Sequence, residues 1–446
     1  MPFGRLFRGK PEEPAPTRDP AADDLEAPDA DPADEVPPEW DDAGADLDRS
    51  WRRRAADAIP GGSSTGSKQP DSLYGTGNEV GPTHFTRALG CRLTTAGEAT
   101  LIDCTMALGS VTIGYGDERI VRAAITAAAN GNVAGLAHTA EVELAERLGD
   151  VIPCAEQVRF FKSGGEAVAA AVRVARTATG RSRVVGSGYF GWQDWCAASP
   201  GVPEGTRRDY TAVPFNDVQA LETACRAAGR DLAAVVLEPV VERLPDEQWL
   251  ARARALCDEF GAVLVFDEMK TGFRLARAGY QEVSGVTPDL ATFGKAMSAG
   301  FPLAALAGRR DIMEAAGRTW ISSTLAGESM AIAAALAVLE IYEEDPELCA
   351  TLARVGASMR AAVASAVAAS GVPGTTVTGP DPMWLVRFED PAIERGFLEA
   401  AAAEGVLFKR GACNYAALAH DDDEIFIEIE RAASSALVTV MHEREA

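Results

Sequence analysis

The chain has 446 residues, of which 47% are hydrophobic and 24% charged, so its composition is that of a globular protein with a full core. Its net charge of −24 opposes binding to nucleic acid or to an anionic membrane, and no apolar run reaches the roughly 18 residues of a membrane span. Eight scattered cysteines without CxxC spacing and only four histidines argue against a disulfide scaffold or a metal site. With no apolar segment at the N-terminus, we expect a cytoplasmic location.

Residues 11–50 differ from the rest of the chain in composition. They contain 15 Asp or Glu, two Arg and eight Pro, with almost no large apolar side chains before Trp40. Such a segment buries too little surface to offset the entropy lost on ordering. We therefore expect residues 1–50 to be a disordered acidic tail, with docking to a basic partner as the functional alternative. Folded structure is expected from a short helix at 51–59 onward.

Alternating hydrophobicity over 91–105, with a turn at 95–98, predicts a hairpin. Helical periodicity follows at 120–129, 140–151, 166–179 and 328–342. Apolar or β-branched runs that predict strands occur at 157–161, 182–186, 233–237, 262–266 and 303–307. Short buried strands alternating with helices indicate an α/β fold with a mostly parallel sheet covered on both faces.

A smaller α+β domain is expected at the C-terminus. Its strand signals lie at 384–388, 405–408 and 425–429. We therefore divide the chain into a tail at 1–50, a segment at 51–117 that packs with the small domain, a large ligand-binding domain at 118–330 and the small domain at 331–446. Because ligands in open parallel sheets bind at the carboxyl ends of strands, the informative residues should follow the apolar runs.

Two places offer a hydroxyl group beside a helix start. The segment from Ser163 to Gly165 lies between a strand and a helix, where free backbone N–H groups can bind a phosphate. Glycine turns there are also common for structural reasons. Ser323 and Thr324 precede an Ala-rich helix, either as a further phosphate contact or as a cap.

Two other places offer ionisable groups. Asp267 and Glu268 end a nearly wholly apolar strand, which is unfavourable unless they have partners or a function, and a helix cap is the alternative. Lys295 follows an apolar segment, where a solvated surface charge is the alternative. A phosphate cradle, a buried acid and an amine together are what a pyridoxal 5′-phosphate site requires, and an aromatic ring such as Tyr189 adds a stacking face.

The chain resembles the class III aminotransferases of pyridoxal phosphate fold type I, and within them the glutamate-1-semialdehyde 2,1-aminomutase-like branch, over about residues 55–435. The segments that carry the resemblance are IPGG at 59–62, SGGEA at 163–167, VRVAR at 172–176, GYFGWQDW at 188–195, LEP at 237–239, FDEMKTGFR at 266–274, TFGK at 292–295 and ST at 323–324. Asp267 and Lys295 are 28 positions apart.

The resemblance implies a large domain with a mostly parallel, seven-stranded sheet, a smaller α+β domain and a homodimer with shared active sites. It also implies a role for each matched residue: Lys295 as the Schiff-base lysine, Asp267 as the partner of the pyridine nitrogen, Tyr189 as the stacking aromatic, Ser163, Gly164 and Gly165 as the phosphate site, and Thr324 of the neighbouring subunit as a further phosphate contact.

Three positions depart from the family pattern. Gly165 stands where a hydroxyl residue is usual, Phe190 where a histidine is usual, and the segment 409–415 lacks the acidic residue expected of the aminomutase. We therefore expect a biosynthetic aminotransferase that uses an amine or amino acid donor and a keto or aldehyde acceptor. An intramolecular aminomutase is the alternative, and a binding protein without turnover would be favoured only if Lys295 or Asp267 were missing.

Three cations lie in the region that usually closes over the substrate. They are Arg387, Lys409 and Arg410. Each could hold a substrate carboxylate, and a solvated charge at a strand end is the alternative.

Overall fold

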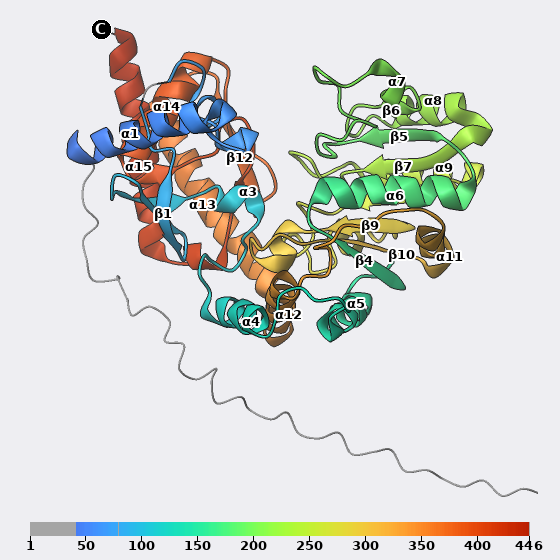
Figure 1. Cartoon of the computed structure of the whole chain (residues 1–446). Helices are drawn as coiled ribbons and strands as arrows, with labels where there is room; N and C mark the ends of the chain where they lie inside the picture. The colour runs from blue at the N-terminus through green and yellow to red at the C-terminus, as the bar shows by residue number, and fades with distance from the viewer. Residues whose placement is uncertain (1–41, 79, 446) are drawn as a thin grey trace, which may run out of the picture. The chain divides into compact units, whose positions relative to one another are not determined.

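The computed structural model describes residues 42–78 and 80–445, and its central element is a seven-stranded sheet in the order β4-β10-β9-β8-β7-β5-β6 (Figure 1). The strands β9, β8, β7, β5 and β6 run parallel, and β10 is antiparallel to both of its neighbours. The mostly parallel, seven-stranded sheet is thus confirmed. Its strands are β4 (Gln157–Phe161), β5 (Arg183–Ser187), β6 (Tyr210–Ala212), β7 (Leu232–Leu237), β8 (Val263–Asp267), β9 (Leu290–Phe293) and β10 (Ala304–Gly308).

Both faces of this sheet are covered by helices. Val236 and Val265 pack with α6 (Gly164–Thr179), whereas Val235 and Leu264 pack with the core that includes α8 (Val218–Ala228) and α9 (Glu247–Phe260). Successive side chains of a strand point to opposite faces, so a strand buried on both sides is apolar at every position. This is why β7 and β8 read as continuous apolar runs.

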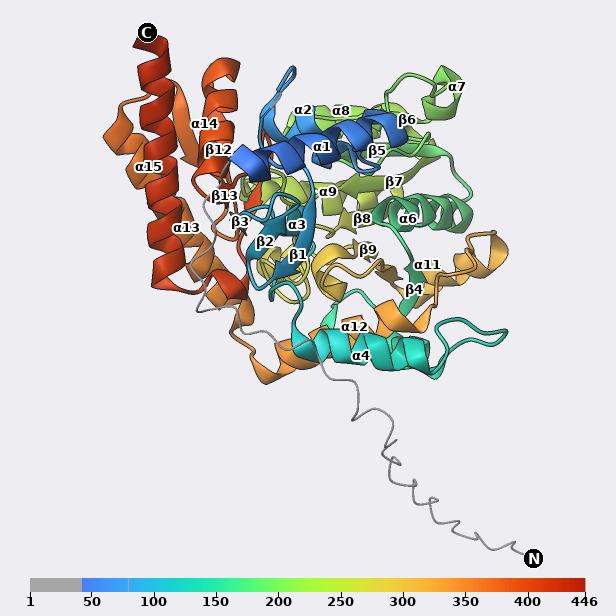
Figure 2. The same cartoon turned by 60° about the vertical axis from the view of Figure 1, so that its left-hand side comes forward.

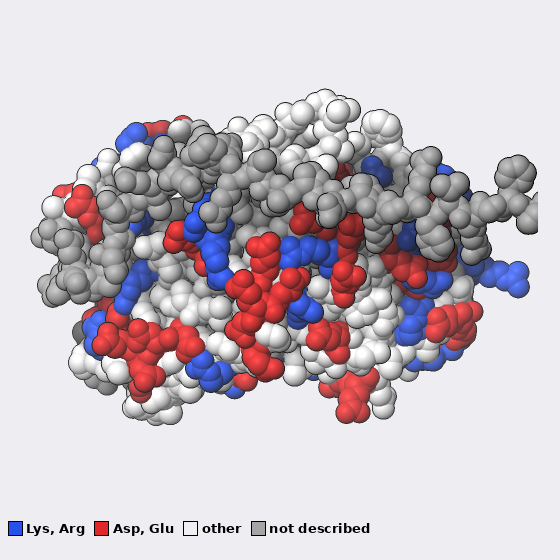
Figure 3. Space-filling model, turned by 90° about the horizontal axis from the view of Figure 1, so that it is seen from below, with Lys and Arg blue, Asp and Glu red and all other residues white. Residues whose placement is uncertain are grey.

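Three helices pack together below the sheet in the view of Figure 1: α4 (Glu118–Ala129), α5 (Thr139–Val151) and α12 (Ser329–Glu344). Figure 3 views the molecule from this side and shows acidic side chains interleaved with basic ones. Arg147 pairs with Glu343 at 2.8 Å and Arg119 with Glu344 at 3.0 Å. The acidic surplus of the chain is therefore partly balanced where these helices meet.

A second sheet joins distant parts of the chain. Its strands are β1 (Phe85–Leu89), β2 (Arg92–Thr95), β3 (Thr100–Asp103) and β13 (Val406–Leu407). The antiparallel pair β2–β3 is the predicted hairpin, and β13 pairs in parallel with β3 through Val406 and Ile102. Figure 2 shows β13 beside these N-terminal strands. The segment before residue 110 is therefore part of the same substructure as the C-terminal region.

The C-terminal region contains a three-stranded sheet and three helices. They are β11 (Thr375–Thr378), β12 (Met383–Phe388), β14 (Asn414–Tyr415), α13 (Leu348–Ser370), α14 (Pro391–Ala403) and α15 (Asp423–Glu445). By length and composition alone α13 could cross a membrane, but its residues Leu352, Val355 and Met359 are buried in the fold and it packs against α15.

The strand predicted at 425–429 is wrong, because this segment is the start of α15. Ile425 and Ile429, four residues apart, are buried, while Ile427 between them is 65% exposed. This is the pattern of one helix face rather than of one strand face, where all three would share a side. Packing against α13 and α14 decides in favour of the helix.

The first described element is α1 (Asp42–Ala58), which begins earlier than the helix expected at 51–59. Asp48 and Ala55 of this helix are buried, so residues 42–50 belong to the folded part of the chain. The rest of the predicted tail, residues 1–41, lies outside the described residues. The remaining short helices are α2 (Pro70–Tyr74), α3 (Met106–Gly109), α7 (Glu204–Arg207), α10 (Tyr280–Ser284) and α11 (Arg310–Met313).

Candidate active site

The carboxyl ends of four adjacent parallel strands lie side by side at one edge of the central sheet. Ser187 of β5 pairs with Leu237 of β7, Leu237 with Phe266 of β8, and Asp267 with Thr292 of β9. The segments that follow these residues are therefore neighbours. This edge is where open parallel sheets bind their ligands.

Asp267 is a buried carboxylate with one oxygen held and the other open. Its Oδ1 accepts the Met269 N–H at 3.1 Å and the Thr292 hydroxyl at 3.0 Å. Among the described residues no donor reaches Oδ2. Burial, followed by the negative charge of Glu238, raises the pKa of Asp267, which is unfavourable for the ionised form. A cationic N–H at Oδ2 would reverse this, so the site suits a protonated ring nitrogen.

Glu268, the next residue, has a structural environment. Its carboxylate accepts the hydroxyl of Thr271 and the backbone N–H groups of Tyr280 at 2.8 Å and Gln281 at 3.0 Å. Those two N–H groups begin α10, where a helix has no internal acceptors. The helix-cap alternative thus describes Glu268 and not Asp267.

Lys295 lies two residues after the end of β9 and opens the 3-10 turn Lys295–Ser298. Its φ of 50° lies in the left-handed region, which costs a non-glycine residue about 1 kcal/mol. Burial lowers the pKa of its ammonium group, and the charge of Lys270 lowers it further, against the opposing charges of Asp267 and Glu238. An amine held in this way is readily deprotonated and nucleophilic.

The start of α6 presents free backbone donors. The Ser163 hydroxyl caps this helix by accepting the Glu166 N–H at 3.3 Å, and the Glu166 carboxylate accepts the Ser163 N–H at 2.9 Å. The N–H groups of Gly164 and Gly165 have no acceptor among the described residues. Two free donors at the N-terminus of a long helix form a site for an anion such as a phosphate.

Neighbouring loops approach these two glycines closely. A Cβ on Gly164 would lie 2.9 Å from the Met269 sulfur, and one on Gly165 would lie 3.1 Å from Nε2 of Gln193. A Cβ on Gly191, in the same loop as Gln193, would lie 3.2 Å from Cα of Gly165. The helix start, the Tyr189 loop and the Asp267 loop thus pack together.

Tyr189 has a fixed backbone and a free ring. Its N–H donates to Oε2 of Glu238 at 2.8 Å, while the side chain is 72% exposed. The next residue, Phe190, is buried and stacks on Trp195 with ring centroids 5.9 Å apart. The Tyr189 ring is therefore free to cover a planar ligand at this edge.

Sequence reasoning assigned no role to three residues that shape this site: Thr292, Glu238 and Lys270. Thr292 orients Asp267, and Glu238 bridges the Tyr189 N–H and the ammonium group of Lys270. Each lies at the end of a strand or just after one. That position, and their place in the matched segments LEP, FDEMKTGFR and TFGK, were the available signals. The contacts themselves depend on the pairing of distant strands.

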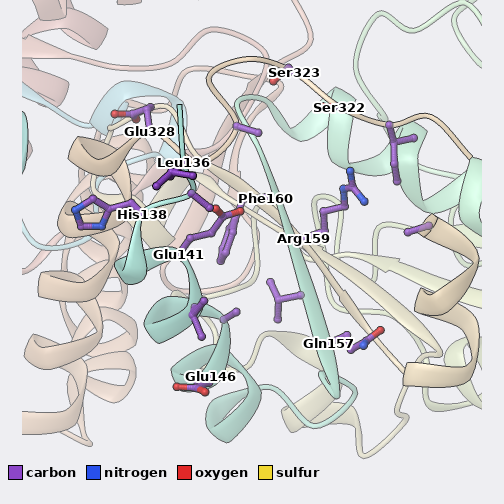
Figure 4. Close-up of a pocket in the computed structure, with 18 of the residues that line it drawn as sticks. Leu136, His138, Glu141, Glu146, Gln157, Arg159, Phe160, Ser322, Ser323 and Glu328 are labelled. Carbon is purple, nitrogen blue, oxygen red and sulfur yellow. The ribbon is translucent and has the colours of Figure 1, made fainter. Parts of the chain in front are cut away.

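Thr324 lies apart from this cluster. It lines a groove of about 1280 Å³ between the segments 130–150, 156–160 and 313–328, which Lys295, Asp267 and Tyr189 do not line (Figure 4). Leu136, labelled in that figure, is 87% exposed. Within one chain, the structure therefore does not bring Thr324 to the other predicted site residues.

Lys162 connects the groove to the site. Its ammonium group pairs with the buried Glu328 at 2.8 Å and donates to the Pro302 carbonyl at 3.0 Å. Glu328 lines the groove and caps α12, whereas Pro302 ends the small-residue turn after Lys295. The ammonium group of Lys162 thus contacts both the wall of the groove and the turn that follows Lys295.

The three candidate substrate cations all have protein partners. These are Glu242 for Arg387, the Ser72 carbonyl for Lys409, and Glu394 together with the Asp71 carbonyl for Arg410. Lys409 and Arg410 therefore connect the C-terminal region to α2.

Solved structures of known function share this fold. The chain superposes on the internal aldimine form, with pyridoxal phosphate, of the FumI protein of Sphingopyxis sp. MTA144 with a TM-score of 0.84 and 28% identity, covering 90% of this chain and 98% of that one. A glutamate-1-semialdehyde aminomutase of Pseudomonas aeruginosa PAO1, 19% identical with a TM-score of 0.76, has the same fold over 89% of this chain and 95% of its own. The fold is that of the pyridoxal phosphate-dependent aminotransferases.

Sequence relatives narrow this class. Residues 74–417 match the family model "Aminotransferase class-III". The chain is 33% identical to the glutamate-1-semialdehyde 2,1-aminomutase of Methanothermobacter thermautotrophicus over 85% of its length and 96% of that protein's. It is 34% identical to the 3-aminobutyryl-CoA aminotransferase of Cloacimonas acidaminovorans over 66% and 72%. The chain belongs to the class-III aminotransferase family, and the expected enzyme class and its cofactor, pyridoxal phosphate, are confirmed.

Proposed function

We propose that the protein transfers an amino group from an amine or amino acid donor to a separate keto or aldehyde acceptor. Its relatives include both aminotransferases and aminomutases, so membership of the family is compatible with two reactions. The amine can pass to a second molecule, or it can return to the neighbouring carbon of the first. The composition of the site favours the transfer between two molecules.

The residues at the sheet edge fit the cofactor. When bound, pyridoxal phosphate supplies an aldehyde that condenses with amines and a ring that takes up the electrons released at the substrate carbon. Asp267 Oδ2 would hold the proton on the ring nitrogen, and the N–H groups of Gly164 and Gly165 would bind the phosphate. Tyr189 would cover the ring. Lys295 would hold the cofactor and, once released, carry the proton to and from the substrate carbon.

The observation that carries the proposal is that, in the part of the chain that the structure describes, no unpaired carboxylate lies beside segment 409–415. An aminomutase must retain a compound with two amino groups, and an acidic side chain is the natural partner for the second one. The segment itself contains no carboxylate. Three acids lie near the segment, and each already pairs with a cation. Glu394 pairs with Arg410 of the segment itself. Glu238, near Tyr415, pairs with Lys270, and Glu242, near Cys413, pairs with Arg387.

The test is a half-reaction. Purified holoenzyme is mixed with single amine donors, without an acceptor, and the absorbance of the bound cofactor is followed. We expect one equivalent of donor to convert the cofactor to its amine form, with one equivalent of carbonyl product free in solution. A keto or aldehyde acceptor should then restore the original spectrum.

The aminomutase alternative predicts a different result. Repeated turnover of glutamate-1-semialdehyde without an acceptor, and without release of a carbonyl product, would contradict the proposal. A donor panel without any spectral change, in an enzyme that does turn over the semialdehyde, would do the same.

We further propose a homodimer in the cytoplasm. The groove with the exposed Leu136 would receive the second copy, so that Thr324 reaches the partner's phosphate site as the family resemblance implies. Trp320, beside the groove segment 321–324, is 83% exposed and adds apolar surface. All eight cysteines are unpaired, which fits a reducing compartment.

A further inference from the structure

A second charged pair lies beside Asp267 and Lys295. Lys270, three residues after Asp267, places its ammonium group 2.9 Å from Oε1 of Glu238. Both side chains are largely buried, with 17% of Lys270 and 6% of Glu238 exposed. A buried pair of this kind needs a reason, because apolar residues in the same space are often equally stable.

Glu238 fixes the loop that carries Tyr189. Its backbone N–H donates to the Ser187 carbonyl at 2.9 Å, and its Oε2 accepts the Tyr189 N–H at 2.8 Å. Between these residues, Gly188 has a φ of 141°, and a Cβ there would lie 2.7 Å from Cγ of Glu238. The carboxylate therefore sets where the Tyr189 loop runs, and Lys270 holds its other oxygen.

The pair also controls the charge around the reacting groups. Facing Lys270 and Glu238 are Asp267, Lys295, Arg274, Cys413 and Tyr415. Without Lys270, the charge of Glu238 would be uncompensated beside Asp267 and Lys295. Two neighbouring carboxylates then compete for the same protons and cations.

We propose that Lys270 is a positioning residue that acts through Glu238. It would hold the Tyr189 loop in place and leave Asp267, among the described residues, as the one uncompensated carboxylate that faces the cofactor ring. The inference rests on the proposed roles of Lys295, Asp267 and Tyr189. It adds a function for a buried pair that lies beside Asp267 and Lys295.

The test is the pH dependence of the visible absorbance of the lysine-bound cofactor. In Lys270→Met the charge of Glu238 is no longer compensated. It should favour the protonated, cationic form of the linkage between lysine and cofactor, and so raise the midpoint of its pH titration by about one pH unit. The double variant Lys270→Met/Glu238→Gln, which removes both charges, should return the midpoint toward that of the wild type. Lys270→Arg, which keeps the charge, should leave it nearly unchanged.

Arg254→Met is the matched control, because Arg254 is similarly buried and pairs with the buried Asp289 at 2.9 Å. Asp289 precedes β9, at the edge of the sheet opposite to the site, so this variant should lower stability without moving the midpoint. Equal midpoints in Lys270→Met, Arg254→Met and wild type would overturn the proposal, as would a double variant that stays as far shifted as Lys270→Met. If Lys270→Met does not fold, Lys270→Gln removes the same charge while keeping a hydrogen-bond donor for Glu238, and the same criteria apply.

Lys295→Ala separates this inference from the proposed function. Loss of the visible band in that variant, together with an unshifted band in Lys270→Met, would refute only the role of Lys270. A visible band that persists in Lys295→Ala, with a cofactor linkage that borohydride still reduces, would refute the proposed attachment site itself.

Discussion

Asp267 and Glu268 are neighbours in the sequence but have opposite surroundings. Asp267 has one carboxylate oxygen free at the sheet edge. Both carboxylate oxygens of Glu268 instead accept hydrogen bonds from the loop at 271–281. Because successive residues at the end of a strand point to opposite faces, one carboxylate can serve the ligand while the next serves the fold. This difference makes the pair a matched test.

Asp267→Asn should retain the fold and lose activity. The amide cannot hold the ring nitrogen in its protonated form by charge, so kcat should fall by about 10²-fold or more, which is the scale of one lost electrostatic contact in a reaction centre. Glu268→Gln should instead lower the melting temperature, because a neutral amide is a weaker acceptor for two buried N–H groups. Steady-state kinetics and thermal melts of both variants check this. Equal effects of the two variants on kcat would contradict the assignment.

The sequence was sufficient to predict which residues follow the strands, and hence that Asp267, Lys295, Tyr189 and the glycines of α6 share an edge. It was not sufficient for Glu238 and Lys270. Their pairing depends on the register of β7 against β5 and β8 and on the path of the loop after Asp267. Neither is encoded in a local pattern.

At the scale of elements, two predictions were wrong because contacts between distant segments cannot be read from a local pattern. They are the strand at 425–429 and the start of the first helix at residue 51. The isoleucines at 425–429 fit period two as well as a helix, and only the neighbouring α13 and α14 select the helix. The acidic start of α1 lacks apolar periodicity, yet its backbone packs on a turn: a Cβ on Gly97 would lie 2.3 Å from the Gly44 carbonyl oxygen. Contacts between distant segments decided both cases.

One element is held in an unfavourable conformation. The turn α3 has positive φ angles at Met106, Ala107, Leu108 and Gly109, between 41° and 78°. Left-handed turns cost about 1–2 kcal/mol for each residue with a Cβ. Arg274 supports this turn by donating a hydrogen bond to the Gly109 carbonyl at 2.5 Å. The same guanidinium group donates to the carbonyls of Lys270 at 3.2 Å and Ala416 at 3.3 Å.

Arg274→Met should therefore lower the free energy of unfolding by about 2–4 kcal/mol, because two buried carbonyls and one partly buried carbonyl lose a charged donor. Denaturant unfolding of the holoenzyme measures this. The control Arg122→Met removes an exposed arginine paired with Glu118 on α4 and should change stability by less than about 0.5 kcal/mol. Similar losses in both variants would show that Arg274 does not support the turn.

At the scale of the whole molecule, the groove lined by Leu136 and Thr324 predicts that two copies of the chain form a dimer. Leu136→Glu places a charge on its apolar wall and should shift the protein from dimer to monomer in light scattering, with weaker retention of the cofactor. Ile427→Glu, on the exposed side of α15, is the control and should leave the dimer intact. A wild-type monomer that holds its full complement of cofactor would contradict the shared site.

Acid should weaken the fold through His420. Burial lowers the pKa of this imidazole from its ordinary 6.5 to about 4. Between these values the unfolded chain binds the proton and the native state does not, so His420 contributes fully above pH 6.5 and its contribution is lost as the pH falls toward 4. The contribution is at most about 3 kcal/mol. Unfolding of wild type and His420→Gln at pH 7 and pH 5 should show a smaller acid loss in the variant, and the exposed His442→Gln should behave as wild type.

The cation Lys162 has one more consequence at this scale. Because it ties the wall of the groove to the turn after Lys295, we expect occupation of the groove and loading of the site to favour the same arrangement of loops. Thermodynamic reciprocity then requires each to strengthen the other by the same factor. Cofactor affinity should rise with protein concentration, and chains deprived of cofactor should separate more readily. The supply of the cofactor would thus set how much of the enzyme is assembled as well as how much is active.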